Sequence, residues 1–300
     1  MTKTFAEKPT GPLSGIRILD LTSVVNGAYG TQILADQGAD VIKVEDPGSG
    51  RGDGGDIMRW AGHLPEGAPK GMGPIFLTIN RNKRSILIDM KSERGKRAMR
   101  RLIQSCDVLA SSVRYEGMKR LGLAYEDVAA IKPDIVFVHA AGYGSDGPYA
   151  GEPAYDDLIQ SASGMADILP RTDGNETPRI LPTLVADKVS GLFLSQAVTA
   201  ALLHKARTGE GQFVEVPMFE CVTSFLLVEH MYDNTFQPPT GQWGYQRVVN
   251  PNRKPFATKD GYIGLLPYTD KQWDQFFDAA GFGEQVKTDP RFADYATRAK

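Results

Sequence analysis

The stretch best suited to chemistry is Leu181–Gly191, L-P-T-L-V-A-D-K-V-S-G. A short apolar run within it ends in the carboxylate of Asp187, and an apolar helix is predicted from Val189 to about Ala206. An Asp at a helix start is a preferred N-cap, because its side-chain oxygen accepts a hydrogen bond from a free backbone amide. The helix dipole favours the ionised carboxylate there. A fixed, anionic carboxylate aimed out of the helix end suits a covalent nucleophile.

The same pattern fits a second interpretation, in which Asp187 caps the helix and takes no part in chemistry. Asp is common at N-caps for purely structural reasons. The stretch by itself leaves both interpretations open, so other segments must decide between them.

A second candidate is the cation-rich run N-R-N-K-R-S at Asn80–Ser85. Its three cations, Arg81, Lys83 and Arg84, lie next to two amides and resemble a phosphate-binding site. The alternative is a solvated, charged turn before a strand predicted at Ile86–Asp89.

The elements that must position these residues begin with a compact βαβ unit. It comprises a strand at Ile16–Leu21, a helix that ends near Gln37 and a strand at Asp40–Val44. Such a unit implies a parallel sheet. The turn after its first strand lies at the carboxyl edge of the sheet, where ligands bind in open α/β folds. Asn26–Gly30 does not form G-x-G-x-x-G, so a dinucleotide fingerprint is absent, and a turn without a ligand role remains an alternative.

Strands and helices alternate through about residue 140, and the unbroken apolar run Ile135–His139 is typical of a strand buried on both faces. The sequence therefore predicts a doubly wound, Rossmann-like α/β domain with a mainly parallel sheet. We expect a large catalytic domain at residues 1–218, a helix and linker at 219–250, and part of a smaller α+β domain at 251–300. An Asp-Gly turn within Phe256–Leu265 predicts a hairpin in that smaller domain.

Composition excludes several classes of protein. The chain of 300 residues is 41% hydrophobic and 23% charged with a net charge of −2, so it has no basic surplus for nucleic acid. Its two cysteines, Cys106 and Cys221, form no C-x-x-C, which fits a reducing compartment. The four histidines are scattered, so no metal site is expected. No membrane-length apolar run and no secretory h-region are present, and we expect a cytoplasmic protein.

Nine segments run in one order from Gly15 to Phe292 and together resemble the class III CoA transferases. That family includes formyl-CoA transferase and carnitine CoA transferase, and the α-methylacyl-CoA racemases are its relatives. The segments are G-I-R-I-L-D-L-T, L-A-D-Q-G-A-D-V-I-K-V-E, N-R-N-K-R-S-I-L-I-D-M-K, R-L-G-L-A-Y-E-D-V, Y-G-S-D-G-P-Y, L-V-A-D-K-V-S-G, K-A-R-T-G-E-G-Q, F-A-T-K-D-G-Y-I-G and D-P-R-F.

The resemblance implies a role for each matching position. The catalytic carboxylate of the family falls on Asp187. The family's contacts with CoA fall on Ser23, Val24, Asn26, Lys83, Arg120, Leu121 and Met218. The chain departs from the pattern at Ser111–Glu116, where many relatives have E-N-F-R-P-G, so side-chain contacts from Ser112 and Val113 are not carried over.

The resemblance also implies an activity and an assembly. CoA would pass between an acyl-CoA donor and a free carboxylic acid through a covalent aspartyl intermediate, without a metal. Two subunits would interlock as a homodimer, and a segment after Lys300 would complete the large domain. A racemase is the alternative, but it needs a second base that relatives supply as a His where this chain has Tyr155, and a phenol of pKa about 10 is a poor base. A CoA- or nucleotide-binding module without activity is the third interpretation.

Overall fold

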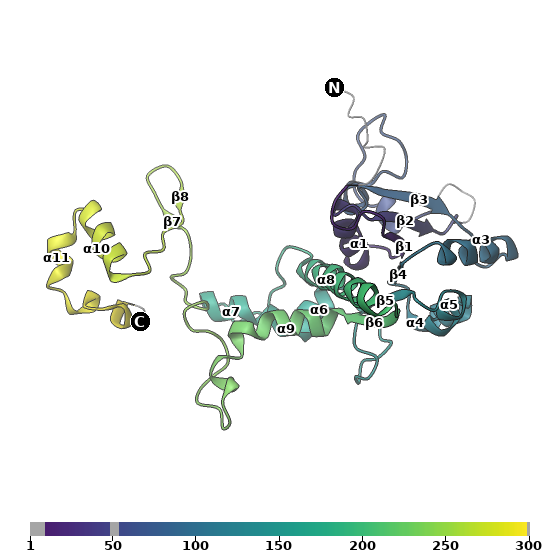
Figure 1. Cartoon of the computed structure of the whole chain (residues 1–300). Helices are drawn as coiled ribbons and strands as arrows, with labels where there is room; N and C mark the ends of the chain where they lie inside the picture. The colour runs from purple at the N-terminus through teal and green to yellow at the C-terminus, as the bar shows by residue number, and fades with distance from the viewer. Residues whose placement is uncertain (1–9, 49–53, 299–300) are drawn as a thin grey trace. The chain divides into compact units, whose positions relative to one another are not determined.

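The computed structural model describes residues 10–48 and 54–298 and divides the chain into two compact units (Figure 1). The first unit comprises Met1–Ala166 and Arg179–Val228, and the second comprises Asp167–Pro178 and Glu229–Lys300. The predicted division at residues 218 and 250 stays a prediction. The N-terminal segment searched for a secretory signal lies, up to residue 9, outside the described residues.

The first unit is built on a six-stranded sheet in which every neighbouring pair is parallel. Its strand order is β3-β2-β1-β4-β5-β6, which is the order of two βαβαβ halves that meet between β1 and β4. The prediction of an α/β fold with a parallel sheet is therefore confirmed. The strands are β1 (Arg17–Leu21), β2 (Asp40–Glu45), β3 (Lys83–Leu87), β4 (Val108–Ser111), β5 (Val136–Ala141) and β6 (Gln212–Pro217).

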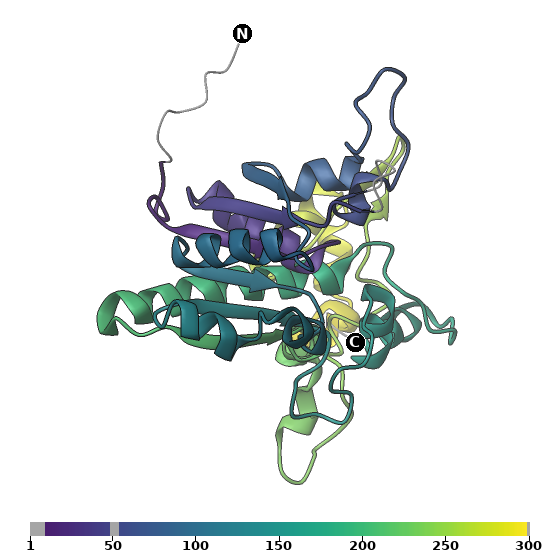
Figure 2. The same ribbon diagram turned by 90° about the vertical axis from the view of Figure 1, so that its right-hand side faces the viewer.

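Helices cover both faces of this sheet, because successive residues of each buried strand point to opposite sides. In β1, Ile18 belongs to one apolar cluster with Leu194, and the next residue, Leu19, belongs to the other cluster with Met99. Figure 2 views the sheet from the side of the second cluster. The first face carries α1 (Asn26–Asp36) and α8 (Val185–Thr208), and the second carries α3 (Glu93–Gln104), α4 (Tyr115–Leu121) and α5 (Tyr125–Ile131).

The segment around β3 differs from the prediction. The strand predicted at Ile86–Asp89 is β3 and begins at Lys83, because its backbone pairs with β2 from the Val41–Lys83 register onward. As an edge strand, β3 tolerates the charged side chains that made this stretch look like a turn. A short helix, α2 (Pro74–Ile79), also precedes it.

The remaining elements complete the connections. In the first unit, η1 (Ile57–Arg59) lies between β2 and α2, and α6 (Asp156–Ala162) lies between β5 and α8. The predicted hairpin is confirmed as the antiparallel pair β7 (Phe256–Ala257) and β8 (Tyr262–Ile263). None of the described helices combines the length and the apolar content needed to cross a lipid bilayer. The other elements are η2 (Met165–Asp167), α7 (Ile168–Asp173), α9 (Met218–His230), η3 (Tyr232–Thr235), α10 (Asp270–Ala279), α11 (Gly283–Lys287), η4 (Pro290–Phe292) and α12 (Tyr295–Arg298).

Candidate active site

The carboxyl edge of the sheet collects several of the predicted site residues. Ser23 and Val24 follow β1, Ser112 follows β4, and Met218 follows β6 as the first, buried residue of α9. The Ser23 amide donates to Ser112 Oγ at 3.0 Å, so the turns after β1 and β4 are in direct contact. Ser112, at which no side-chain contact was carried over, therefore lies beside Ser23.

Asp187 lies within the first turn of α8 and is 9% exposed. The prediction that it is the N-cap of a helix starting near Val189 is wrong, because α8 starts at Val185 and its N-cap is Leu184. The side chain of Asp156, in the first turn of α6, accepts the Asp187 backbone amide at 3.0 Å. A free amide of α8 is thus satisfied by a carboxylate that comes 31 residues earlier in the chain.

Two helix starts meet at the Asp187 carboxylate. The backbone amide of Asn26, the first residue of α1, favours the ionised form of this carboxylate. The helices approach closely because glycines face each other: a side-chain carbon at Gly191 would lie 2.8 Å from the Asn26 carbonyl oxygen, and one at Gly30 would lie 2.8 Å from the Gly191 carbonyl oxygen. The predicted contact residue Asn26 is therefore held directly against the predicted nucleophile.

The environment of Asp187 raises the pKa of its carboxyl group to about 6. Burial is the main cause, the negative charge of Asp156 adds to it, and the Asn26 amide opposes both. The expectation that the helix start holds Asp187 in its ionised form is corrected in direction, because desolvation outweighs the favourable amide. A carboxyl group with a pKa near 6 is still mostly ionised at pH 7, and such perturbed groups cluster at functional sites.

Gln160 fixes the position of Asp156 relative to the segment that leads into α8. Its Nε2 donates to Asp156 Oδ1 at 2.6 Å, and its Oε1 accepts the Leu181 amide at 2.9 Å. Both Asp156 and Gln160 are buried. The sequence analysis did not link Asp156 to Asp187. The available signal was an Asp followed four residues later by Gln, which stacks both side chains on one helix face.

Lys83 lies in a different environment from the one that its sequence suggests. Its ammonium is buried and lies 2.8 to 2.9 Å from four oxygens: Asp20 Oδ2, the Ala28 carbonyl, Thr31 Oγ1 and Asn80 Oδ1. Burial lowers the pKa of Lys83 to about 8, against the attraction of Asp20. A group enclosed in this way is not presented to a phosphate, so the geometry does not favour the predicted contact with CoA.

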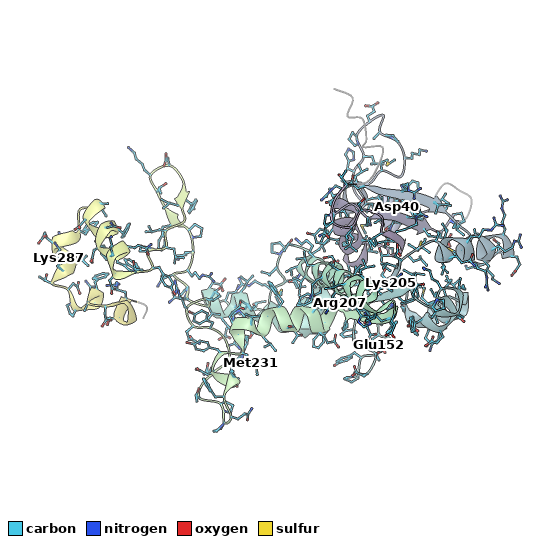
Figure 3. The ribbon with its side chains drawn as sticks, in the orientation of Figure 1. Asp40, Glu152, Lys205, Arg207, Met231 and Lys287 are labelled. Atoms are coloured by element: carbon cyan, nitrogen blue, oxygen red, sulfur yellow. The ribbon has the colours of Figure 1, made fainter. Side chains whose placement is uncertain are left out.

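The other cations of the same run also have carboxylate partners. Arg81 pairs with Asp36 at 2.5 Å, and Arg84 pairs with Asp40 at 2.6 Å. Asp40 is labelled at the start of β2 in Figure 3. The run therefore ties β3 to α1 and β2, and the interpretation as a phosphate-binding site has no geometric support.

Arg120 and Leu121 form the C-terminal end of α4. Arg120 is exposed, whereas Leu121 packs against the apolar cluster on the second face of the sheet. Their predicted contacts with CoA remain predictions. Over residues 10–48 and 54–298, no three His, Cys, Asp or Glu side chains gather in a way that could hold a metal ion.

Comparison with known proteins matches this geometry to one family. The model of CoA-transferase family III matches residues 13–300. The succinate–glutarate CoA-transferase of Agrobacterium fabrum is 34% identical over 98% of this chain and 72% of its own length. The acetyl-CoA:oxalate CoA-transferase of Acetobacter aceti is 33% identical over 98% of this chain and 73% of its own length.

Solved structures agree. A CaiB/BaiF family protein from Brucella suis superposes with a TM-score of 0.79 at 31% identity, over 96% of this chain and 74% of that protein. The structure of Rv3272 from Mycobacterium tuberculosis gives a TM-score of 0.81 at 32% identity, over 97% of this chain and 74% of that protein. The chain therefore belongs to CoA-transferase family III, the CaiB/BaiF family.

Proposed function

We propose that this protein transfers CoA from an acyl-CoA donor to a free carboxylic acid, with Asp187 as the covalent nucleophile. Family membership supports the class of reaction, and the two relatives named above are both CoA transferases that act on carboxylates by their names. The observation that carries the assignment of Asp187 is its place in the fold. It is a buried carboxyl group with a pKa of about 6 at the point where two helices begin.

The proposed reaction begins when an Asp187 oxygen attacks the thioester carbonyl carbon of the donor. The carbon–sulfur bond breaks, CoA leaves as the thiolate, and Asp187 carries a mixed anhydride. The thiolate then attacks the Asp187 carbonyl carbon, which releases the donor acid as a carboxylate and forms an aspartyl-CoA thioester. Covalent catalysis of this kind replaces one difficult exchange by easier steps.

The second half repeats these steps with the acceptor. Its carboxylate attacks the aspartyl thioester, expels the CoA thiolate and forms a new mixed anhydride. The thiolate attacks the acceptor carbonyl carbon, which yields the new acyl-CoA and regenerates the Asp187 carboxylate. No proton is gained or lost over the cycle, so the site needs a positioned carboxylate more than a general base.

Several further assignments belong to this proposal. CoA would bind at Ser23, Val24, Asn26 and Met218 along the carboxyl edge and at Arg120 and Leu121 at the end of α4. No metal would take part. An interlocked homodimer in the cytoplasm completes the proposal, and light scattering would test the dimer. Lys83 would act through the buried network around Asp20, not on a phosphate.

The position of Tyr155 does not support the alternative function, a racemase. Tyr155 occupies the position where the racemases have a His, and it is 69% exposed at the N-cap of α6. A tyrosine phenol is a weak base near neutral pH. Epimerisation of a 2-methylacyl-CoA at a rate comparable with CoA transfer would overturn this choice.

Hydroxylamine trapping tests the nucleophile directly. The protein is incubated with acyl-CoA in the absence of an acceptor and then treated with hydroxylamine, which attacks activated carboxyl groups. We expect a hydroxamate at Asp187, located by peptide mass, because both proposed intermediates activate that carbonyl carbon. Asp157, which is exposed and next to Asp156 in the chain, provides an internal control and should stay unmodified. A hydroxamate at another residue would assign the nucleophile elsewhere.

The pH dependence of kcat/KM should show that the charge of Asp156 contributes to the raised pKa of Asp187. Asp187 must be ionised to attack, so kcat/KM should rise with pH through about 6 and level off above it. Asp156→Asn keeps an oxygen that can accept the Asp187 amide but removes the repelling charge. The acidic limb should therefore move to lower pH, as a pH–rate profile would show.

Asp157→Asn is the matched control, since Asp157 is the exposed neighbour of Asp156 on the same helix. It should leave the acidic limb of the kcat/KM profile at the same pH as in the wild type. A limb that stays near pH 6 in Asp156→Asn would show that Asp156 does not set the pKa of Asp187.

A further inference from the structure

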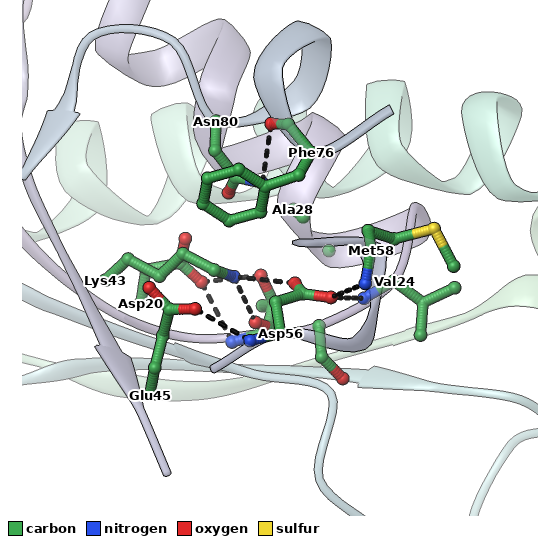
Figure 4. Close-up of polar contacts among 12 residues, drawn as sticks. Asp20, Val24, Ala28, Lys43, Glu45, Asp56, Met58, Phe76 and Asn80 are labelled. Carbon is green, nitrogen blue, oxygen red and sulfur yellow. Dashed lines mark hydrogen bonds and ion pairs between the residues drawn. The ribbon is translucent and has the colours of Figure 1, made fainter. Parts of the chain in front are cut away.

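A buried ion pair lies beneath the turn that follows β1. Lys43, on β2, and Asp56, in the segment between β2 and α2, have side chains that are both 1% exposed. Lys43 Nζ lies 3.0 Å from Asp56 Oδ2 (Figure 4) and donates to the Thr22 carbonyl at 2.6 Å. Neither residue has a part in the proposed reaction.

The second carboxylate oxygen of Asp56 reaches the turn itself. Asp56 Oδ1 accepts the backbone amide of Val24 at 3.3 Å and that of Met58 at 3.0 Å (Figure 4). The bond to Met58 makes Asp56 the N-cap of η1. One carboxylate therefore joins three parts of the chain: the β2 lysine, the start of η1 and the β1–α1 turn.

Val24 needs such a restraint because its backbone is in the left-handed region, with φ at 63°. That region is unfavourable for a β-branched residue. Conformations of this kind persist only where the surroundings hold them, and they cluster at binding and catalytic sites. Val24 itself is 37% exposed.

A second anchor fastens the same segment to the sheet. The Arg59 guanidinium donates to both carboxylate oxygens of Glu45, at 2.6 and 2.7 Å, and lies 3.8 Å from the centre of the Phe76 ring. Glu45 also accepts the Asp56 amide at 2.7 Å. Asp56 is thus fixed through its backbone as well as through its side chain, which makes it a rigid support for the turn.

We propose that Asp56, paired with Lys43, is a positioning residue for acyl-CoA. It holds the Thr22–Asn26 turn in the strained conformation that places Ser23, Val24 and Asn26 at the carboxyl edge of the sheet. This inference rests on the proposed CoA contacts of that turn. Asp56 itself acts through the backbone of Val24 and touches no reacting atom.

Asp56→Ala should therefore act on substrate binding more than on chemistry. We expect the KM for acyl-CoA to rise on the order of 10-fold, with little change in kcat at saturating acyl-CoA or in the KM for the acceptor acid. Hydrogen exchange of the peptide that spans residues 22–26 should become faster without any ligand. Unchanged exchange in this peptide, or an unchanged KM for acyl-CoA, would overturn the proposal.

A double-mutant cycle with Val24→Gly tests the strain directly. Glycine adopts a positive φ readily, so the turn no longer needs to be held against a steric preference. The rise in KM caused by Asp56→Ala should be several-fold smaller in the Val24→Gly background than in the wild type. An equal rise in both backgrounds would show that Asp56 does not act through Val24.

Lys205→Met serves as the control for a general loss of stability. Lys205, labelled on α8 in Figure 3, pairs with Asp134 at 2.8 Å and with Asp107 at 3.4 Å before β5 and β4, at the amino edge of the sheet. Its loss should lower stability without changing the KM for acyl-CoA, and a rise in KM like that of Asp56→Ala would overturn the proposal. Turnover by the wild type and by Asp187→Asn tests the proposed CoA transfer separately. A failure of that function is therefore distinguishable from a failure of the proposed role of Asp56.

Discussion

Asp187→Asn should lower the rate of CoA transfer by about 10⁴-fold or more, as the loss of a covalent nucleophile does in other enzymes. An amide can form neither the mixed anhydride nor the aspartyl thioester. Asn has nearly the same size, and its backbone amide still donates to Asp156, so α8 keeps its start. Transfer assays at saturating acyl-CoA, with circular dichroism to confirm folding, provide the measurement.

The same substitution should stabilise the protein at neutral pH. The Asp187 pKa is raised to about 6, so the folded protein holds a proton there at pH values where the unfolded chain has lost it. Stability is therefore lost as pH rises from about 4 to about 6, and Asn avoids that loss. In urea unfolding at pH 8, we expect the free energy of unfolding of Asp187→Asn to be higher than that of the wild type by on the order of 2 kcal/mol. Near pH 4 the two free energies should differ little.

Two further variants complete this test. Asp187→Glu keeps the charge but displaces the oxygens by about one methylene, and a misplacement of about 1 Å can cost about 100-fold in rate. Asp157→Asn, on the neighbouring exposed carboxylate, should leave transfer unchanged. Near-wild-type transfer by folded Asp187→Asn would show that the Asp187 side chain has only a structural role.

Lys83→Ala should lower the free energy of unfolding by about 3–5 kcal/mol, the cost of breaking a buried ion pair by removing one partner. The Asp20 carboxylate, fully buried, would lose its nearest positive charge while it still accepts hydrogen bonds from Thr22 and Thr31. Burial raises the pKa of Asp20, but the Lys83 and Lys43 ammonium groups hold it below its usual value. Urea unfolding at pH 7 measures this loss.

Exposed ion pairs provide the control for Lys83. Lys119→Ala breaks an exposed pair with Glu116 and should leave stability nearly unchanged. In the Lys83→Ala background, Asp20→Asn should recover part of the lost stability by removing the unpaired charge. If Lys83→Ala unfolds like the wild type but binds CoA more weakly, and the loss shrinks at high salt, the phosphate interpretation of Lys83 is correct.

Much of the fold follows from local patterns. The strands β1, β2, β5 and β6 are apolar or alternating runs, and the Asp-Gly turn between β7 and β8 is a local signal that needs no distant partner. The order of these elements predicted a parallel sheet with ligand residues at its carboxyl edge. The order of the nine family segments then predicted the family.

The errors fall where a distant contact outweighs the local pattern. The start of α8 depends on Asp156, which caps it from α6, and no residue next to Asp187 reveals this. The sequence places the apolar run before the predicted helix, whereas its last residues form the first turn of that helix. Chain position therefore predicted a nucleophile, whereas only packing placed a second carboxylate beside it.

The charged residues also divide into what the sequence determines and what only the tertiary structure decides. The sequence determined that Asp187 lies beside the start of a predicted helix and that Lys83 lies in a cation-rich run before a predicted strand. Tertiary structure decided which of them are buried and which charge faces each one, because burial and Coulomb interactions depend on distance in space. It raised the pKa of Asp187, enclosed the ammonium of Lys83 among oxygens, and set Asp56 between Lys43 and the backbone of Val24.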